Sequence, residues 1–188
     1  MPRTSDARNR MIRATAQLQS EHGTRGVALS EVIELSRAPR GSIYHHFPEG
    51  KAQLVGEATQ YGGTLVGDTL DALIDGTTSP EELLTVVAGY WAATLEATGF
   101  RAGCPVAAGA LDDDDSSART VAAVAFARWS ESLSGHLTRR GIPEAEAGDL
   151  AVLTIAAFEG ALILARAHHS TEPLHQVFRA LAASVRQR

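Results

Sequence analysis

Apolar residues recur every three or four positions along most of the chain, and no segment shows a clear alternation of apolar and polar residues. This spacing places apolar side chains on one face of a helix, so the pattern predicts an all-α protein. The first periodic segment runs from about residue 4 to residue 22, with Met11, Ala14 and Leu18 on one face. Gly23 follows as a stop signal, because glycine is common just after a helix end.

Two short helices are expected next. Ser30 is a favourable N-cap for a helix that begins at Glu31, whose carboxylate suits the positive end of the helix dipole. Pro39 fits the first position of a second short helix over residues 39–47, because a proline there gives up no needed hydrogen bond.

Longer helices with marked starts make up the rest of the chain. Ser79-Pro80-Glu81-Glu82 is a capping box with proline in the first turn. Helices are expected from about Lys51 to Asp75, from Pro80, after Ser116-Ser117, from about Pro143 to His168, and from Thr171-Glu172-Pro173. In the first of these, Gly62-Gly63 indicates a kink, a hinge or close packing.

The region with the most specific pattern is residues 29–54, LSEVIELSRAPRGSIYHHFPEGKAQL. It predicts two short helices joined by a tight turn, a layout typical of a helix-turn-helix whose second helix enters the DNA major groove. Residues at the front of that helix must be small or able to hydrogen-bond, because they meet base edges and phosphates. Ile43 and Phe47 are expected to face the domain core. The candidate DNA-binding residues are Ser30, Arg40, Gly41, Ser42, Tyr44, His45 and Lys51.

Several motifs resemble one known family. Gly41-Ser42-Ile43-Tyr44-His45-His46-Phe47 closely resembles the recognition helix of the TetR family of transcriptional repressors, which typically reads G-S-x-Y-x-H-F. Pro48-Glu49-Gly50-Lys51 and Gly99-Phe100-Arg101-Ala102-Gly103-Cys104-Pro105 resemble the LmrA/YxaF-type branch of that family. The strong match covers about residues 8–56.

The resemblance implies a nine-helix fold with two functional parts. Residues 1–50 would form a helix-turn-helix DNA-binding domain, and residues 51–188 a helical effector-binding and dimerisation domain. In such families the residue at Arg40 reaches a base or a phosphate. Ser42 and Tyr44 would then lie at the groove, and His45 and Lys51 would touch phosphates.

Three positions depart from the family pattern. Arg37 stands in the turn where the family usually has glycine, which costs about 1 kcal/mol if the site needs a positive φ. Ala28 replaces the usual Thr or Ser cap of the second helix, so Ser30 is expected to take over as the cap. Gln19 replaces a usual aromatic core residue.

The body of the chain offers candidates for an effector pocket and for a dimer interface. Aromatic and apolar residues that could line a pocket, with plain core packing as the alternative for each, are Tyr61, Trp91, Leu95, Phe100, Phe126, Trp129 and Phe158. The helix over residues 143–168 is apolar nearly all round, so one side is expected to meet the body and the other a second copy. The candidate interface residues are Leu153, Ala157, Ala161, Leu174, Phe178 and Leu181.

The formal net charge of −5 is unevenly distributed. Residues 1–60 hold eight Lys and Arg against six acidic residues, whereas the remaining 128 residues carry a net charge of −7. A basic head on an acidic body indicates that the head meets a polyanion, although counts this small also arise by chance.

No metal or cofactor is expected. The single cysteine, Cys104, excludes a disulfide framework and a cysteine-rich zinc site, and we expect it to be an inert thiol. His168, His169 and His175 do not have the i, i+4 spacing of helical metal ligands. Asp112–Asp115 is expected to be a solvated loop before the next helix, with a cation site as the alternative.

Enzyme and membrane classes gain no support. The motifs GxSxG, HExxH and GxGxxG and a phosphate-binding loop are absent from the sequence. The N-terminal residues lack the apolar run of a signal peptide. The most apolar stretch, Ala151 to Ala165, is interrupted by Glu159 and is expected to be too short to span a bilayer. We therefore expect a cytoplasmic protein.

The sequence thus predicts a homodimeric transcriptional regulator, a repressor that a small apolar or aromatic effector releases from a palindromic operator. The alternative is a helical ligand-binding adaptor with degenerate DNA binding, which Arg37 and Ala28 keep open.

Overall fold

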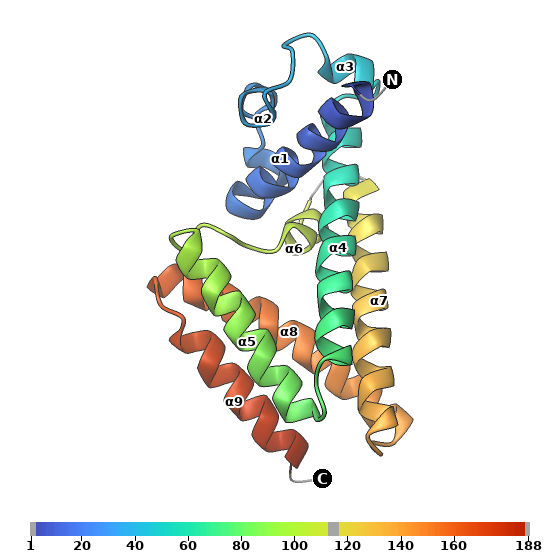
Figure 1. The fold of residues 1–188 in the computed structure, drawn as a ribbon, viewed down its shortest axis with the longest axis vertical. Helices are drawn as coiled ribbons and strands as arrows, with labels where there is room; N and C mark the ends of the chain where they lie inside the picture. The colour runs from blue at the N-terminus through green and yellow to red at the C-terminus, as the bar shows by residue number, and fades with distance from the viewer. Residues whose placement is uncertain (1–2, 113–116, 187–188) are drawn as a thin grey trace. The chain divides into compact units, whose positions relative to one another are not determined.

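The computed structural model describes residues 3–112 and 117–186, and this part of the chain forms nine α-helices and no strand (Figure 1). The helices are α1 (Arg3–Gly26), α2 (Leu29–Ser36), α3 (Ile43–His46), α4 (Lys51–Asp75), α5 (Pro80–Ala97), α6 (Pro105–Ala110), α7 (Ser117–Arg139), α8 (Glu144–His168) and α9 (Glu172–Arg186). The all-α prediction is confirmed. Residues 113–116, which include most of the expected acidic loop and Ser116, lie outside the described residues.

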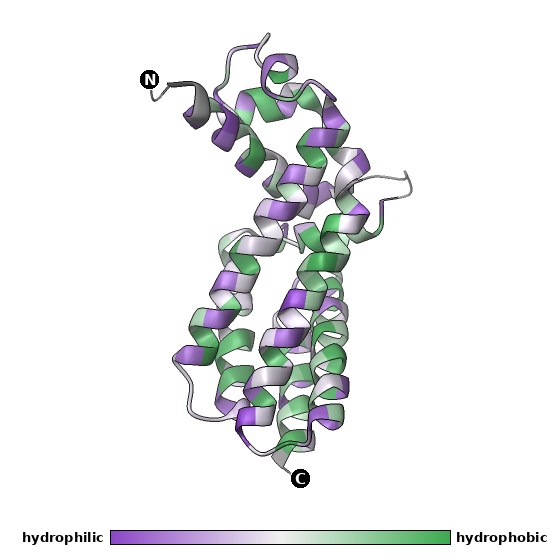
Figure 2. Cartoon of the chain, turned by 90° about the vertical axis from the view of Figure 1, so that its right-hand side faces the viewer, coloured by the Kyte–Doolittle hydropathy of each residue, from purple (hydrophilic) through white to green (hydrophobic). Residues whose placement is uncertain are grey.

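The chain divides into two compact units. Unit 1 comprises Met1–Leu65 and Cys104–Ala125, and unit 2 comprises Val66–Gly103 and Phe126–Arg188. The helices α4 and α7 therefore each contribute one end to either unit. Along the helices of both units, hydrophobic residues recur at helical spacing, with hydrophilic residues between them (Figure 2).

Unit 1 is built around a core in which Met11, Val32, Ile43, Phe47 and Leu54 are almost or completely inaccessible. The predicted inward orientation of Ile43 and Phe47 is confirmed. Because Ile43 is the first residue of α3 and Phe47 is its C-cap, their burial fixes a helix too short to be stable alone.

The start of each short helix differs from the prediction. α2 begins at Leu29 with Ala28 as its N-cap, and no side chain caps it; Ser30 lies exposed inside the first turn. Pro39 does not open α3. Instead, Ser42 donates from its backbone N and its Oγ to the carbonyl of Pro39, at 3.0 and 2.7 Å, which closes a turn before the helix. Both expectations were wrong because a local cap or proline preference is weaker than the packing of the core residues beside it.

Gly62 and Gly63 mark close packing rather than a kink. A Cβ on Gly62 would lie 2.5 Å from Cγ of Pro105 on α6, and a Cβ on Gly63 would lie 2.7 Å from Cβ of Ala125 on α7. Glycine therefore lets α6 and α7 approach α4 at distances that any side chain would prevent.

One helix was not predicted from residue patterns. α6 has only six residues, too few for a periodic apolar pattern. Its N-cap is Cys104, which is buried and whose sulfur accepts from the backbone N of Ala107 at 3.4 Å; Pro105 occupies the first turn.

Unit 2 contains a core that includes Ile74, Leu83, Leu133 and Ala151, from α4, α5, α7 and α8. The predicted capping box of α5 is confirmed, since Ser79 Oγ accepts from the backbone N of Glu82 at 3.1 Å. α9 packs along both α5 and α8.

Among the described helices, α8 alone is long and apolar enough, by length and composition, to cross a membrane. The helix continues on both sides of its most apolar stretch, Ala151 to Ala165, to a length of 25 residues. Buried core helices meet the same criteria, and 33% of the apolar window is buried within the chain. The helix therefore has a covered side and an exposed apolar side.

A buried histidine makes the stability of unit 2 depend on pH. His136 on α7 is 1% exposed, and its Nε2 has no hydrogen-bond partner. Burial, together with the charges of Arg140 and Arg139, lowers the pKa of His136 below its usual 6.5. The folded state therefore favours neutral His136, so its contribution to stability is complete above pH 6.5 and is lost as the pH falls below it.

We expect urea denaturation at pH 7.5 and pH 5.5 to show a loss of unfolding free energy in the wild type, at most about 1.4 kcal/mol per pH unit from this group. His136→Leu should show a smaller loss over the same interval, because it removes the titrating group. Parallel losses in both proteins would contradict this assignment.

Candidate functional site

The helix pair α2 and α3 presents a group of exposed residues on the turn between the two helices and on α3. Arg37 ends α2 in the left-handed conformation, at φ 53° and ψ 35°, which turns the chain toward α3. Arg10 on α1 donates to the carbonyl of Ser36 at 2.9 Å and so holds the end of α2 in place. The hydrogen bond from α1 therefore holds in place the end of α2 from which the exposed residues follow.

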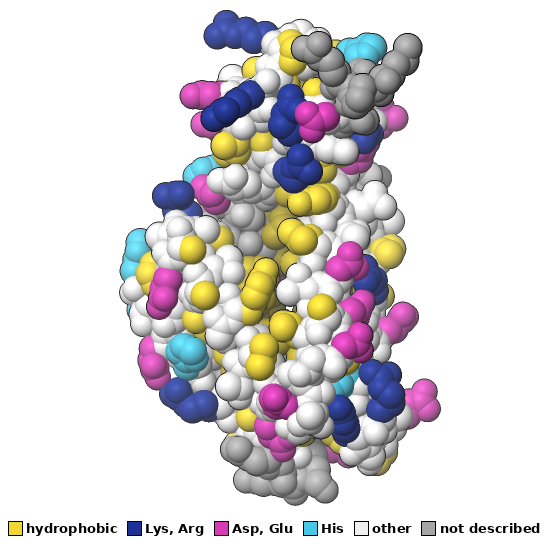
Figure 3. Space-filling model, in the orientation of Figure 1, with side chains coloured by type: hydrophobic (Ala, Val, Ile, Leu, Met, Phe, Trp, Pro, Cys, Tyr) yellow, Lys and Arg dark blue, Asp and Glu magenta, His cyan; other side chains and the backbone are white. Residues whose placement is uncertain are grey.

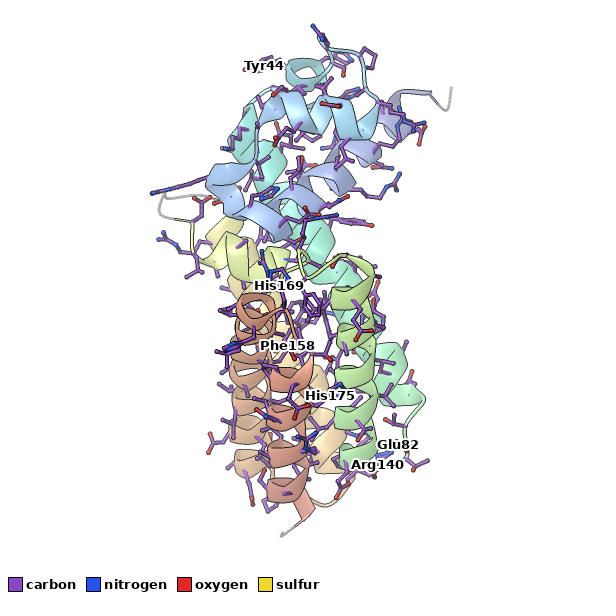
Figure 4. The ribbon with its side chains drawn as sticks, turned by 90° about the vertical axis from the view of Figure 1, so that its left-hand side faces the viewer. Tyr44, Glu82, Arg140, Phe158, His169 and His175 are labelled. Atoms are coloured by element: carbon purple, nitrogen blue, oxygen red, sulfur yellow. The ribbon has the colours of Figure 1, made fainter. Side chains whose placement is uncertain are left out.

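The predicted DNA-binding residues fall into three places. Arg40, Gly41, Tyr44 and His45 are exposed together on the turn and on α3, with half-buried Ser42 between them. Tyr44 is 69% exposed and projects from α3 (Figure 4). Ser30 lies apart in the first turn of α2, and Lys51 in the first turn of α4.

Lys51 and Tyr44 lie beside the junction of α3 and α4. Lys51 Nζ donates to the carbonyl of Arg25 at 3.1 Å, so it stabilises the end of α1 and keeps two further protons for another acceptor. The ring of Tyr44 lies over Gly50, 3.6 Å from where a Cβ would be. His46, which sequence reasoning did not select, has its pKa lowered by partial burial and by His45 and Arg8.

Two of the departures from the family pattern, Ala28 and Arg37, lie at the two ends of α2, and neither disrupts the pair α2 and α3. Ala28 serves as the N-cap through its backbone, whose carbonyl accepts from Val32 at 3.1 Å. Arg37 adopts a left-handed conformation, which glycine, the usual residue of the family at this position, would favour. The turn therefore does need a positive φ, the condition under which a cost was expected from the sequence. The arginine is therefore expected to lower the free energy of unfolding without changing the geometry of the turn.

We expect Arg37→Gly to raise the free energy of unfolding by up to about 1 kcal/mol, because glycine adopts a left-handed backbone without steric cost. Arg37→Ala is the matched control, since it removes the same side chain and keeps the Cβ. Chemical denaturation of both variants checks this. Equal stability of the two would show that the left-handed conformation costs nothing here.

Comparison with known proteins identifies both halves of this arrangement. The model of the family "Bacterial regulatory proteins, tetR family" matches residues 11–58. The model "Transcriptional regulator LmrA/YxaF-like, C-terminal domain" matches residues 80–180. The chain belongs to the TetR family of DNA-binding transcriptional regulators.

Individual relatives agree with this assignment. An uncharacterised HTH-type transcriptional regulator of Mycobacterium tuberculosis, Rv0196, is 39% identical over 93% of this chain and 91% of its own length. The crystal structure of a TetR regulator from Chloroflexus aurantiacus is 27% identical over 100% of this chain and 98% of its own, with a TM-score of 0.82. A cysteine mutant of the TetR-family regulator CifR, complexed with 26-bp double-strand operator DNA, shares the fold at a TM-score of 0.76 and 19% identity, over 93% and 94% of the two chains.

In unit 2 of this TetR-family regulator, the effector candidates form separate aromatic groups. Trp91 on α5 and Phe158 on α8 have ring centroids 5.0 Å apart, and Phe178 on α9 lies 6.4 Å from Phe158. Phe158 points into the helical unit (Figure 4). Leu95, one turn beyond Trp91, is completely buried.

The remaining candidates lie elsewhere. Phe126 and Trp129 contact each other on α7 at 5.2 Å, and Phe100 contacts His169 at 5.6 Å between two helix ends. Tyr61 packs against the core of unit 1, so it does not join the aromatic groups of unit 2.

Sequence reasoning missed a row of partly buried aliphatic residues. Leu70 and Leu73 on α4 and Val87 on α5 pack around the core of unit 2 without being enclosed. Apolar side chains gather along this face between α4 and α5 (Figure 3). Their helical spacing indicates an apolar face, a signal that the choice of mainly aromatic residues as effector candidates did not use.

The predicted dimer interface needs correction. Ala161, Leu174, Phe178 and Leu181 are each at most 7% exposed within one chain, because α9 turns its apolar stripe toward α5 and α8. Only Leu153, 51% exposed, and half-buried Ala157 remain accessible. The exposed apolar residues of α8, which we call the α8 stripe, are Val152, Leu153, Ile163 and Leu164, exposed by 61%, 51%, 65% and 48%.

A groove of about 730 Å³ runs between α7 and α8 and includes none of the predicted effector residues. Glu131, Arg139, Glu144 and Asp149 contribute charged groups to it, and Val152 of the α8 stripe forms part of its wall. The groove therefore continues the exposed face of α8.

Proposed function

We propose that this chain is a homodimeric cytoplasmic repressor that binds a near-palindromic operator through residues 1–50 and senses an effector through residues 51–188. The observation that carries the proposal is the exposed group Arg40, Gly41, Tyr44 and His45, on a turn and a short helix that buried Ile43 and Phe47 anchor. A dimer would present two such groups about one DNA turn apart. Family membership and a structural neighbour bound to operator DNA support it.

The test is a DNA-selection assay with purified wild type, Arg40→Ala and Tyr44→Ala. We expect enrichment of a palindromic site for the wild type and a loss of about 1–3 kcal/mol of binding for each removed groove contact. Arg179→Ala and Tyr90→Ala are matched controls, because they remove exposed side chains of the same types from α9 and α5. No enrichment at low salt would contradict the proposal.

The effector is proposed to be a small apolar or aromatic molecule that enters unit 2 beside Trp91 and Phe158. Apolar surface and aromatic faces offer such a molecule dispersion and stacking contacts. Its binding would shift the dimer toward a conformation in which the two recognition helices no longer match the operator. The shift is limited to the difference in effector affinity between the two states, typically about 1–3 kcal/mol.

The second copy is proposed to cover the α8 stripe. Four large apolar side chains exposed along one face of a helix are unusual on a monomer surface and common at interfaces between copies.

A further inference from the structure

A single amide group joins three helices of unit 1. The side chain of Gln19 on α1 is completely buried. Its Nε2 donates to Oγ1 of Thr59 on α4 at 2.8 Å and to the carbonyl oxygen of Pro105 on α6 at 2.7 Å. One side chain therefore sets the position of α1 relative to both α4 and α6.

The partners of Gln19 are themselves fixed. Thr59 Oγ1 donates to the carbonyl of Val55 at 2.9 Å, which leaves its oxygen free to accept from Gln19. A Cβ on Gly109 of α6 would lie 2.7 Å from Cγ2 of Thr59, so α6 and α4 are in direct contact. Pro105, in the first turn of α6, is bonded to the amide, so a displacement of that turn would act directly on Gln19.

The amide is retained at a cost. Oε1 of Gln19 and Oγ1 of Thr15, one turn earlier on α1, are buried without hydrogen-bond partners. Such a buried unsatisfied polar atom costs about 1–3 kcal/mol, which an apolar side chain would avoid. A local violation of this kind is expected where a residue serves function rather than stability.

Gln19 links the segment after Gly103, where the chain leaves unit 2, to the helix α1 that packs under the recognition helix. Pro105 comes two residues after Gly103, where the chain leaves unit 2. At the other end of α1, Met11 is completely buried in the core that holds Ile43 and Phe47. A change in the segment before α6 therefore has a bonded route to the helix that carries Tyr44.

We propose that Gln19 is a positioning residue that transmits the state of unit 2 to the recognition helix through the Pro105 carbonyl. The inference rests on the proposed function for its purpose. It differs from a structural role in one respect: removing the amide should abolish the effect that a change in unit 2 has on the recognition helix, which a loss of stability alone would not do.

The test is a double-mutant cycle on operator affinity. Gln19→Met keeps the length of the side chain and removes both hydrogen bonds, and Thr59→Val removes the one to α4 alone. The connection is perturbed by Phe100→Gly, because glycine suits the φ of 60° at that position and lacks the ring that contacts His169. Operator affinity and hydrogen exchange of the α1 and α3 amides are measured for each variant.

We expect Phe100→Gly to change operator affinity at least about threefold in the wild-type background and less than about 1.5-fold in the Gln19→Met background, a coupling within the range of residues in one network. Thr59→Val should give an intermediate result, because it removes one of the two hydrogen bonds of Gln19. An equal effect in both backgrounds, or none in the wild type, would overturn the proposal.

Hydrogen exchange keeps the two proposals apart. If the wild type binds no DNA, the proposed function fails, and the coupling is still read from α3 amides. Phe100→Gly should then change their exchange in the wild type but not with Gln19→Met. Unchanged or equally changed exchange would overturn the role of Gln19 alone.

Discussion

Leucine in place of Gly41 is expected to weaken operator binding strongly while leaving the fold intact. Gly41 is exposed, its φ is not in the left-handed region, and a Cβ built on it would meet nothing within 4 Å. The chain itself therefore gives no reason for glycine at this position. A close approach of DNA to the backbone in front of α3 would supply one.

The expected loss is about 1–3 kcal/mol for each half-site, the usual cost of excess volume in a packed contact. Two half-sites double it, so operator affinity should fall by roughly 30-fold or more. Fluorescence anisotropy with the selected operator measures the affinity, and thermal unfolding verifies the fold.

Gly89→Leu is the matched control for this substitution. Gly89 is likewise exposed with open space around it, but it lies on α5 in unit 2. Unchanged affinity is expected for this variant. If Gly41→Leu bound the operator as tightly as Gly89→Leu, the turn before α3 would not contact DNA.

The recognition segment was the part most accessible to sequence reasoning. Ile43 and Phe47 are spaced for one helix face, and both are buried as that spacing predicts. The limits of α2 and α3 were not accessible, because Ala28 and Pro39 take their roles from the packing of Val32 and Ile43 rather than from their own preferences.

Periodicity also could not identify what covers an apolar face. The stripe of α9 is as regular as that of an interface helix, yet Leu174 and Phe178 are buried within their own chain. In α8, Leu162 is 2% exposed while its neighbour Ile163 is 65% exposed. Both are apolar, so only the tertiary structure separates the inward side from the outward side.

Placing charges on the α8 stripe is expected to give a monomer that no longer binds the operator tightly. Leu153→Glu combined with Ile163→Glu would put two unpaired carboxylates into the proposed interface from each copy. Burying an unpaired charge costs several kcal/mol, so the dimer should dissociate at micromolar concentration. Within one chain both side chains are more than half exposed, so folding should be unaffected.

Light scattering after size exclusion measures the mass of the particle, and anisotropy measures operator binding. A monomer has one recognition helix and loses the gain of linked half-sites, which is about 10²–10⁴-fold in affinity. Val124→Glu is the control, because Val124 is 67% exposed but lies on α7 in unit 1 and is not part of the stripe. It should remain a dimer with wild-type affinity. A dimer that survived the charges on α8 would place the second copy on another face.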